Sequence, residues 1–334
     1  MAPLIVLVCL SQCQRAFAID TAKSSPHADI RSLLNSGQAN NAVAALQKIL
    51  SANPQDAEAH NLLCRVHYQE QRWSDASKEC QIAVQQDPNN SEFHDWLGRA
   101  YGEEAERASL LTAYGLAKKV HSEFEASVRL SPQNINGLCD LGEYSVEAPG
   151  FLGGGLNRAQ TIAMALQPLD VAKYHGLQAK IAIKNRNIVA AERELKLAVA
   201  QSKSPARAWM DLASFYGKQS NFSAMEQAIQ SGMSVDIAHS SALVDGASIL
   251  MRYKRNLPLA EHLLRLYLAS ANQSEDAPAF QVHAALGNVL AQEGLESESL
   301  QEYATAQGLA SGYDATKLSS RLTPLGDPVW TCRG

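Results

Sequence analysis

The chain has 334 residues, of which 46% are hydrophobic, 19% charged and 6% aromatic, and its formal net charge is −5. This composition is typical of a globular protein, because disordered chains are less apolar and more strongly charged. The modest negative charge also excludes the dense basic surface that is typical of nucleic-acid-binding proteins.

The N-terminal residues resemble a secretion signal, although no Lys or Arg precedes the apolar run. Residues 3–10 are apolar and lead to Ala16-Phe17-Ala18, a small-x-small cleavage pattern. The run is too short to span a bilayer as a helix. We expect residues 1–18 to be a signal peptide, so that the mature chain is periplasmic or secreted. A lipid anchor at Cys9 or Cys13 is less favoured, because the residue before each cysteine is not small.

A spacing of 34 residues recurs along the mature chain. It separates Pro54 from Pro88, Leu63 from Leu97, and His60 from His94, and it appears again between His175 and Trp209. A period of 34 residues is the length of one helix-turn-helix repeat. The sequence therefore predicts an array of stacked helix pairs.

The segment from Asp56 to Pro88 shows how one period divides into two helices. The first helix carries small or apolar residues on one face, and the second does the same at spacings of i, i+4, i+7 and i+8; the two sets are His60, Leu63, Cys64, His67 and Ala76, Cys80, Ala83, Val84. A polar turn at residues 71–74 separates them. Asp87-Pro88-Asn89-Asn90 ends the unit, because proline cannot continue a helix.

These positions resemble the tetratricopeptide repeat. The best matches are Leu97-Gly98 with Tyr101; Ala191, Leu195 and Ala198; Trp209, Leu212, Ala213 and Tyr216; and Leu286-Gly287 with Tyr303 and Ala306. The resemblance implies an all-α fold, a right-handed superhelical solenoid of antiparallel helix pairs, in an exported bacterial repeat protein. We expect about eight units over residues 19–310, with the first, fourth and seventh degenerate.

Three segments depart from the regular array. Pro88 and Pro132 are 44 residues apart, and the extra length falls in residues 103–120, which we expect to lengthen both helices of that unit. A glycine-rich loop follows at residues 147–155. Residues 311–334 contain several apolar residues and a tryptophan, and we expect them to cap the open end of the last helix pair.

The loop Gly150–Gly155 is the nearest approach to a phosphate-binding loop. Such a loop needs a preceding strand and an adjacent Lys and Ser or Thr, whereas here Leu156-Asn157-Arg158 follows. A long turn with left-handed glycines is the favoured interpretation. A partner contact through exposed Phe151 and Leu152 is the alternative.

His60, Cys64 and His67 lie on one predicted helix face, and Cys80 is expected beside them on the next helix. Three arrangements fit these residues: packed thiols and imidazoles, a Cys64–Cys80 disulfide, and a tetrahedral zinc site. Packing is favoured, because the repeat buries these positions without any metal.

In the family, the first helices of successive repeats line a concave ligand groove. The positions that project into it include Glu58, Glu92, Glu143 and Glu147 of the second to fourth units. The candidate contacts are Asn61, Arg65, Tyr68, Asp95, Arg99, Lys173, Lys180, Lys184, Arg207 and Lys218. The fifth and sixth units contribute only basic charge there, which predicts a site for an acidic peptide or a C-terminal carboxylate. A solvated helix face is the competing interpretation, and the full carboxylate-clamp set of the family is not present.

No catalytic motif occurs in the sequence, which contains neither Gly-x-Ser-x-Gly nor His-Glu-x-x-His. We therefore expect no enzymatic activity, cofactor, metal or membrane span. The main hypothesis is an exported scaffold that binds a polypeptide in its groove. Two alternatives stay open: a metal- or redox-responsive module, and an accessory subunit of an envelope enzyme.

Overall fold

A computed structural model describes residues 26–314 of the chain. Those residues form sixteen α-helices and one 3-10 turn, and they contain no strand. The predicted all-α fold is thereby confirmed. The predicted signal peptide, residues 1–18, lies outside the described residues, as does the predicted C-terminal cap beyond residue 314.

The helices form eight antiparallel pairs. The pairs are α1 (Pro26–Asn35) and α2 (Ala39–Ala52); α3 (Ala57–Gln69) and α4 (Trp73–Gln86); α5 (Ser91–Arg107) and α6 (Leu110–Leu130); α7 (Ile135–Glu147) and α8 (Leu156–Leu166); α9 (Val171–Lys184) and α10 (Ile188–Gln201); α11 (Ala206–Lys218) and α12 (Phe222–Val235); α13 (Ala242–Arg252) and α14 (Leu257–Leu268); α15 (Ala279–Gln292) and α16 (Glu296–Leu309).

Short signals in the sequence begin the helices and turn the chain within each pair. Asp56, Asn90 and Asn134 each accept hydrogen bonds from backbone N–H groups in the first turn of the helix that follows. Seven of the pairs contain a turn residue with positive φ: six have one at Gly37, Gln71, Arg186, Ser220, Lys254 or Gly294, and the longer α7–α8 connection has Gly153 and Gly155. The same backbone conformation therefore reverses the chain in most repeats, which keeps the pairs alike.

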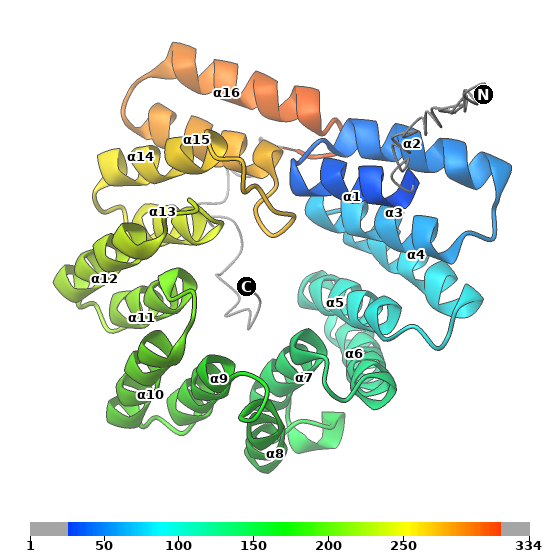
Figure 1. Cartoon of the computed structure of the whole chain (residues 1–334), viewed down its shortest axis with the longest axis horizontal. Helices are drawn as coiled ribbons and strands as arrows, with labels where there is room; N and C mark the ends of the chain where they lie inside the picture. The colour runs from blue at the N-terminus through cyan, green and yellow to red at the C-terminus, as the bar shows by residue number, and fades with distance from the viewer. Residues whose placement is uncertain (1–25, 315–334) are drawn as a thin grey trace, which may run out of the picture.

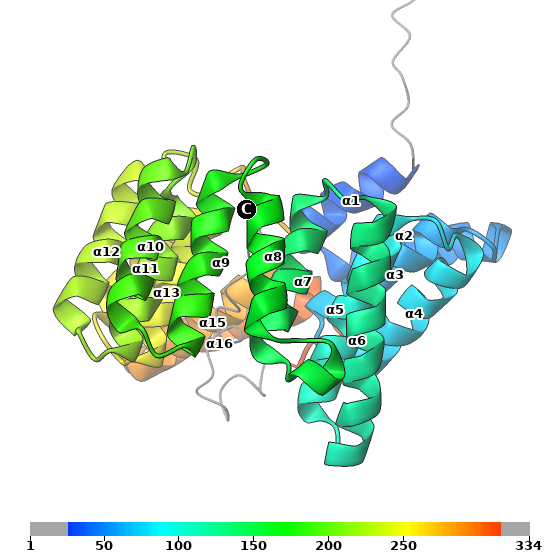
Figure 2. The same cartoon turned by 90° about the horizontal axis from the view of Figure 1, so that it is seen from below.

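The third pair is longer than its neighbours. Helix α5 has 17 residues and α6 has 21, against 13 in α3 and 14 in α4. The prediction that residues 103–120 lengthen both helices is confirmed. The two helix ends extend beyond the rest of the molecule (Figure 2), and Leu110 and Leu111 at the start of α6 are 94% and 85% exposed.

The eight pairs curve into a ring, with the odd-numbered helices on the inner side and the even-numbered helices outside (Figure 1). The first and last repeats meet, and α16 contacts α2. One hydrophobic cluster joins Leu34, Leu46 and Leu62 of the first repeats to Phe280 and Tyr313 of the last. The sequence predicted a solenoid with an open end, whereas in the structure the first and last repeats pack against each other.

Polar contacts and one close backbone approach complete the closure. Arg65 donates from two nitrogens to Glu275, at 2.7 and 3.0 Å, and Asn40 donates to the Gly308 carbonyl at 2.9 Å. Gly37 has φ of +66°, and a Cβ there would lie 2.2 Å from the Ala279 nitrogen. A side chain at position 37 would therefore hold the two ends of the chain apart.

None of the helices described between residues 26 and 314 combines the length and the apolar character that a bilayer crossing requires.

Candidate functional site

The predicted groove residues lie on the inner helices α3, α5, α9 and α11. Those on α3 and α5 lie at or near Trp96. Of those on α9 and α11, Lys173, Lys180 and Arg207 line a cavity between α7 and α13, and Lys184 and Lys218 do not.

The Trp96 cluster consists of Arg65, Asp95, Trp96, Arg99 and Asp140. The guanidinium groups of Arg65 and Arg99 lie 5.0 and 4.7 Å from the centre of the Trp96 ring. Arg99 also pairs with Asp95 at 2.7 Å and with Asp140, whereas Arg65 pairs with Glu92 and Glu275. Both arginines are already bound to carboxylates. The cluster therefore holds the inner helices α3, α5 and α7 in position relative to one another.

Asn61 and Tyr68 lie beside this cluster on α3. Tyr68 packs its ring edge-on against Trp96 at 5.5 Å and donates to Glu103 at 3.3 Å. Asn61 is fully buried, and neither its amide nitrogen nor its amide oxygen has a hydrogen-bond partner within residues 26–314. An unsatisfied buried amide costs free energy.

The basic positions of the fifth and sixth repeats meet acidic residues of the adjacent repeats. Lys180 pairs with Glu143, Lys184 with Glu147 at 2.6 Å, and Arg207 with Asp245 at 3.2 Å. The expectation of a purely basic groove segment is thus corrected. That expectation was based on each helix alone. Stacking of the repeats places a carboxylate of a neighbouring repeat against Lys180, Lys184 and Arg207. Lys218, the last residue of α11, completes the predicted set.

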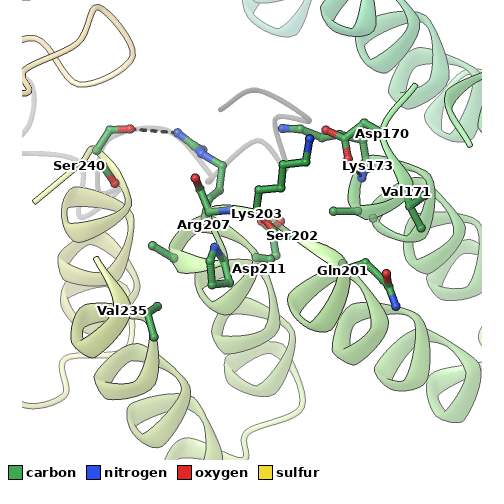
Figure 3. Close-up of a pocket in the computed structure, with 18 of the residues that line it drawn as sticks. Asp170, Val171, Lys173, Gln201, Ser202, Lys203, Arg207, Asp211, Val235 and Ser240 are labelled. Atoms are coloured by element: carbon green, nitrogen blue, oxygen red, sulfur yellow. Dashed lines mark hydrogen bonds between the residues drawn. The ribbon is translucent and has the colours of Figure 1, made fainter. Parts of the chain in front are cut away.

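A cavity of about 890 Å³ opens on this part of the inner surface. Its wall includes the chain before α9, the chain before α11 and the residues between α12 and α13. Figure 3 shows Lys173, Lys203, Arg207 and Asp211 around it. Arg207 is held in place by Asp245 and by the Ser241 hydroxyl, to which it donates at 3.2 Å.

Lys173 differs from the other basic residues of the cavity wall. Within residues 26–314 no ion pair closer than 4.0 Å joins its ammonium group to a carboxylate. Burial lowers the pKa of Lys173, and the nearby Arg207 guanidinium lowers it further. Lys173 is therefore a cation that lacks both full hydration and a direct counter-ion.

Asp211 shows the opposite perturbation. Burial raises the pKa of its carboxyl group from 3.8 to about 6, although Arg207, Lys180 and Lys173 act against that shift. Burial likewise raises the pKa of Asp245. The wall of the cavity thus combines incompletely solvated charges of both signs, which is typical of sites that bind a polar ligand.

The loop Gly150–Gly155 forms a tight turn, the interpretation that the sequence favoured. Gly153 and Gly155 have positive φ, and the Tyr144 hydroxyl fixes the loop by donating to the Leu152 carbonyl at 2.7 Å. Phe151 is 74% exposed and stacks near Tyr114 at 6.4 Å between ring centres. The loop therefore exposes one aromatic ring at the base of the α5–α6 extension.

Cys64 and Cys80 form a disulfide that links α3 to α4, with 5.3 Å between their Cα atoms. The other two residues of the possible zinc set have protein partners. His60 contacts Glu79 at 2.7 Å, and His67 lies 3.6 Å from Glu70. Both thiols are used by the disulfide, so this structure does not have the ligand set that zinc would require.

The sequence analysis did not identify Trp96, Asp211 or Asp245 as site residues. Asp211 follows Arg207 by four residues, and this spacing already indicated that the two lie on the same face of the helix. Asp245 follows Asp211 by one repeat period of 34 residues, a second signal. Trp96 was not selected as a site residue, because its position in the repeat is normally a packing position.

Comparisons with known proteins agree with this architecture. A family model for the tetratricopeptide repeat matches residues 33–100. Comparison of the sequence with curated proteins gives no significant match. Among solved structures, yeast Tom70 is similar over 92% of this chain and 66% of its own, with 13% identity and a TM-score of 0.53.

A second similar structure is TTC0263, a tetratricopeptide-repeat protein of Thermus thermophilus. It has 18% identity and a TM-score of 0.48, over 57% of this chain and 96% of its own. The matched repeat model, the recurring 34-residue unit and the eight stacked helix pairs together identify the chain as a tetratricopeptide-repeat protein.

Proposed function

We propose that this protein is an exported scaffold that binds a polypeptide on the inner surface of its ring and has no catalytic activity. Tetratricopeptide-repeat proteins generally act as non-catalytic scaffolds for protein or peptide partners. The cavity between α7 and α13 is the proposed recognition point, and an acidic side chain or C-terminal carboxylate of the ligand binds there.

The observation that carries this proposal is Lys173, a partly buried cation without a direct counter-ion in the cavity wall. A ligand carboxylate would replace the solvation that the ammonium group has lost, and charge-assisted hydrogen bonds of this kind are among the stronger polar contacts. Lys180 and Arg207 are already paired, so they orient the ligand rather than attract it.

Export is supported by the Cys64–Cys80 disulfide. Disulfides of this kind persist in oxidising compartments and are rare in the reducing cytosol of mesophilic organisms. The signal-like residues 1–18 of the sequence point to the same compartment.

A peptide selection with matched variants tests the recognition site. Random nonapeptides would be selected on the mature protein, and affinities of the selected peptides measured for wild type, Lys173→Met and Lys48→Met. Lys48 is an exposed lysine on the outer helix α2 and serves as the control.

We expect the selected peptides to contain a carboxylate that cannot be replaced by its amide. Lys173→Met should weaken their binding at least about tenfold, equivalent to roughly 1.4 kcal/mol, whereas Lys48→Met should leave it unchanged. Selected peptides without an acidic group, or equal affinities for the wild type and Lys173→Met, would show that the proposal is wrong.

A further inference from the structure

An exposed apolar patch runs along the α5–α6 extension, which projects beyond the rest of the molecule (Figure 2). Leu110 and Leu111 begin α6 at its tip and are almost fully exposed. Tyr114, one turn further along α6, is 44% exposed and stacks near the exposed Phe151 of the α7–α8 connection. We call these four side chains the extension patch. Such a cluster of large apolar side chains in water is typical of a surface that contacts an apolar partner.

The side chains of this patch follow a fixed order from the tip of the extension inward. Leu110, Tyr114 and Lys118 are spaced at i, i+4 and i+8, so they share one face of α6. The Lys118 ammonium group lies 4.5 Å from the centre of the Tyr114 ring, and that of Lys119 lies 4.9 Å from the Tyr101 ring. The order is therefore aliphatic, aromatic and cationic. Side chains have this order of depth at a membrane interface, where aromatic rings lie at the headgroups and lysines reach the water.

The two rims of the ring differ in charge. Because the paired helices are antiparallel, connections within pairs lie at one rim, the extension rim, and connections between pairs lie at the other, the cavity rim. Over residues 26–314, the connections at the extension rim contain four basic and two acidic residues, which are Arg72, Arg186, Lys254, Arg255, Glu70 and Glu293. Those at the cavity rim contain one basic residue, Lys203, and six acidic residues, among them Asp170 and Asp236. The apolar patch therefore projects from the more basic rim.

Several cations at the extension rim have no direct counter-ion. Among the residues that the structure describes, no carboxylate lies within 4.0 Å of the charged groups of Lys118, Lys119, Arg186 and Lys254. The carboxylates near the tip are matched by a cation, since Arg107 lies 2.9 Å from Glu103 and 3.9 Å from Glu106. An anionic surface that contacts this rim would supply counter-ions to the lysines and meet little uncompensated negative charge at the tip.

The shape and size of the extension patch favour a bilayer over a second folded protein. The patch lies on a projection and not in a groove, so a rigid partner would need a matching cavity, whereas lipid headgroups rearrange around a tip. Four side chains of this size expose roughly 500 Å², which is less than the roughly 800 Å² that each partner buries in a standard protein interface. Insertion of a few apolar side chains together with attraction to anionic lipids is sufficient for binding at a membrane surface.

We propose that the α5–α6 extension docks this protein on the surface of an anionic phospholipid bilayer. Leu110, Leu111 and Phe151 enter the boundary between headgroups and acyl chains, and Lys118 and Lys119 contact the anionic headgroups. The cavity around Lys173 is lined by connections between pairs, so it faces away from the bilayer in this orientation. The docking does not depend on the proposed peptide recognition.

Co-sedimentation with lipid vesicles tests the docking. The mature wild type, the double variant Leu110→Gln, Leu111→Gln and the variant Ile237→Gln would each be mixed with vesicles of phosphatidylcholine and phosphatidylglycerol in equal parts, and with vesicles of phosphatidylcholine alone. Ile237 is the matched control, because it is 93% exposed but lies in the connection between α12 and α13, at the cavity rim. All three side chains are exposed, so the variants should keep the helix content of the wild type in circular dichroism.

We expect the wild type and Ile237→Gln to bind the mixed vesicles equally, and the leucine double variant to bind them at least about tenfold more weakly. The variant Lys118→Gln, Lys119→Gln should also lose at least about tenfold on the mixed vesicles, and all four proteins should bind phosphatidylcholine alone more weakly. A wild type that does not bind the mixed vesicles, or that binds them no better than the leucine variant, would overturn the proposal.

Hydrogen exchange locates the contact on the protein. With mixed vesicles present, amides of residues 108–115 should exchange at least about fivefold more slowly, while those of residues 202–205 and 236–241 at the cavity rim should not change. Protection of the cavity rim instead would overturn the proposed orientation. A wild type that dimerises through the patch, with a mass that falls to the monomer value in the leucine variant, and that ignores vesicles would assign the patch to an interface between two copies and overturn membrane docking.

Discussion

At the residue scale, charged side chains in the wall of the cavity reduce the stability of the folded protein. Lys173 loses hydration without gaining a direct ion pair, and the pKa of Asp211 is raised to about 6 by burial. A carboxyl group with a raised pKa binds its proton more tightly in the folded state than in the unfolded state. Stability therefore falls as the pH rises from about 4 to about 6. Such costs are common at binding sites, where function opposes stability.

Asp211→Asn tests this cost directly. The asparagine keeps the shape of the side chain but cannot ionise, so we expect the free energy of unfolding at pH 7.5 to rise by about 1–2 kcal/mol. At pH 4, where Asp211 of the folded wild type is protonated, the gain should disappear. Urea denaturation at the two pH values measures both quantities, and an equal effect at both would contradict the raised pKa.

At the element scale, the sequence was sufficient to predict the helix pairs. The 34-residue period, the turn residues and the longer third unit are local features, and local features determine where helices begin and end. The pairing of charges between repeats was not predictable in this way. Glu143 and Lys180 are separated by a whole repeat, and their contact depends on how closely α7 and α9 stack.

A recurring histidine–carboxylate pair links the two helices within four of the repeats. The contacts are His60–Glu79, His94–Glu123, His175–Glu194 and His283–Glu302, at 2.6–2.8 Å. Three of them are 19 residues apart, and the longer third repeat extends the spacing to 29. The sequence contained this regularity, but the sequence analysis used His60, His94 and His175 only as markers of the period or as packed side chains.

His94→Gln tests whether such a pair contributes to stability. The hydrogen bond to Glu123 raises the pKa of His94 above 6.5. A raised folded-state pKa stabilises the protein fully below 6.5, and the contribution disappears as the pH rises through the folded-state value. The wild type should therefore exceed His94→Gln in unfolding free energy by up to about 1 kcal/mol more at pH 6 than at pH 8.5. Urea denaturation measures both values. If the difference in unfolding free energy between the two proteins were the same at both pH values, the His94–Glu123 pair would not stabilise the protein in this way.

At the scale of the whole molecule, closure of the ring was beyond the sequence analysis. Small rotations between successive repeats accumulate along a solenoid, so the position of the last repeat depends on every interface before it. The closing contacts join residues far apart in the chain, such as Arg65 and Glu275, which are 210 residues apart. No local pattern marks either residue as a closing contact.

The comparison of Gly37→Ala with Gly294→Ala tests the closure. Both glycines have positive φ, at +66° and +80°, so each alanine variant loses about 1 kcal/mol through backbone strain. Only at position 37 would the added Cβ meet another repeat, 2.2 Å from the Ala279 nitrogen, whereas the space around Gly294 is open. Relieving that overlap requires the first and last repeats to separate, because the obstructing atoms belong to the backbone.

We expect Gly37→Ala to lose at least about 2 kcal/mol more unfolding free energy than Gly294→Ala. Its radius of gyration in small-angle X-ray scattering should also increase, while helix content by circular dichroism stays the same, since an opened ring keeps its helix pairs. Equal stability and equal radius for the two variants would mean that the first and last repeats do not pack together in solution. The inner surface would then be an open groove, and the polar contacts of Arg65 with Glu275 would not contribute to its shape.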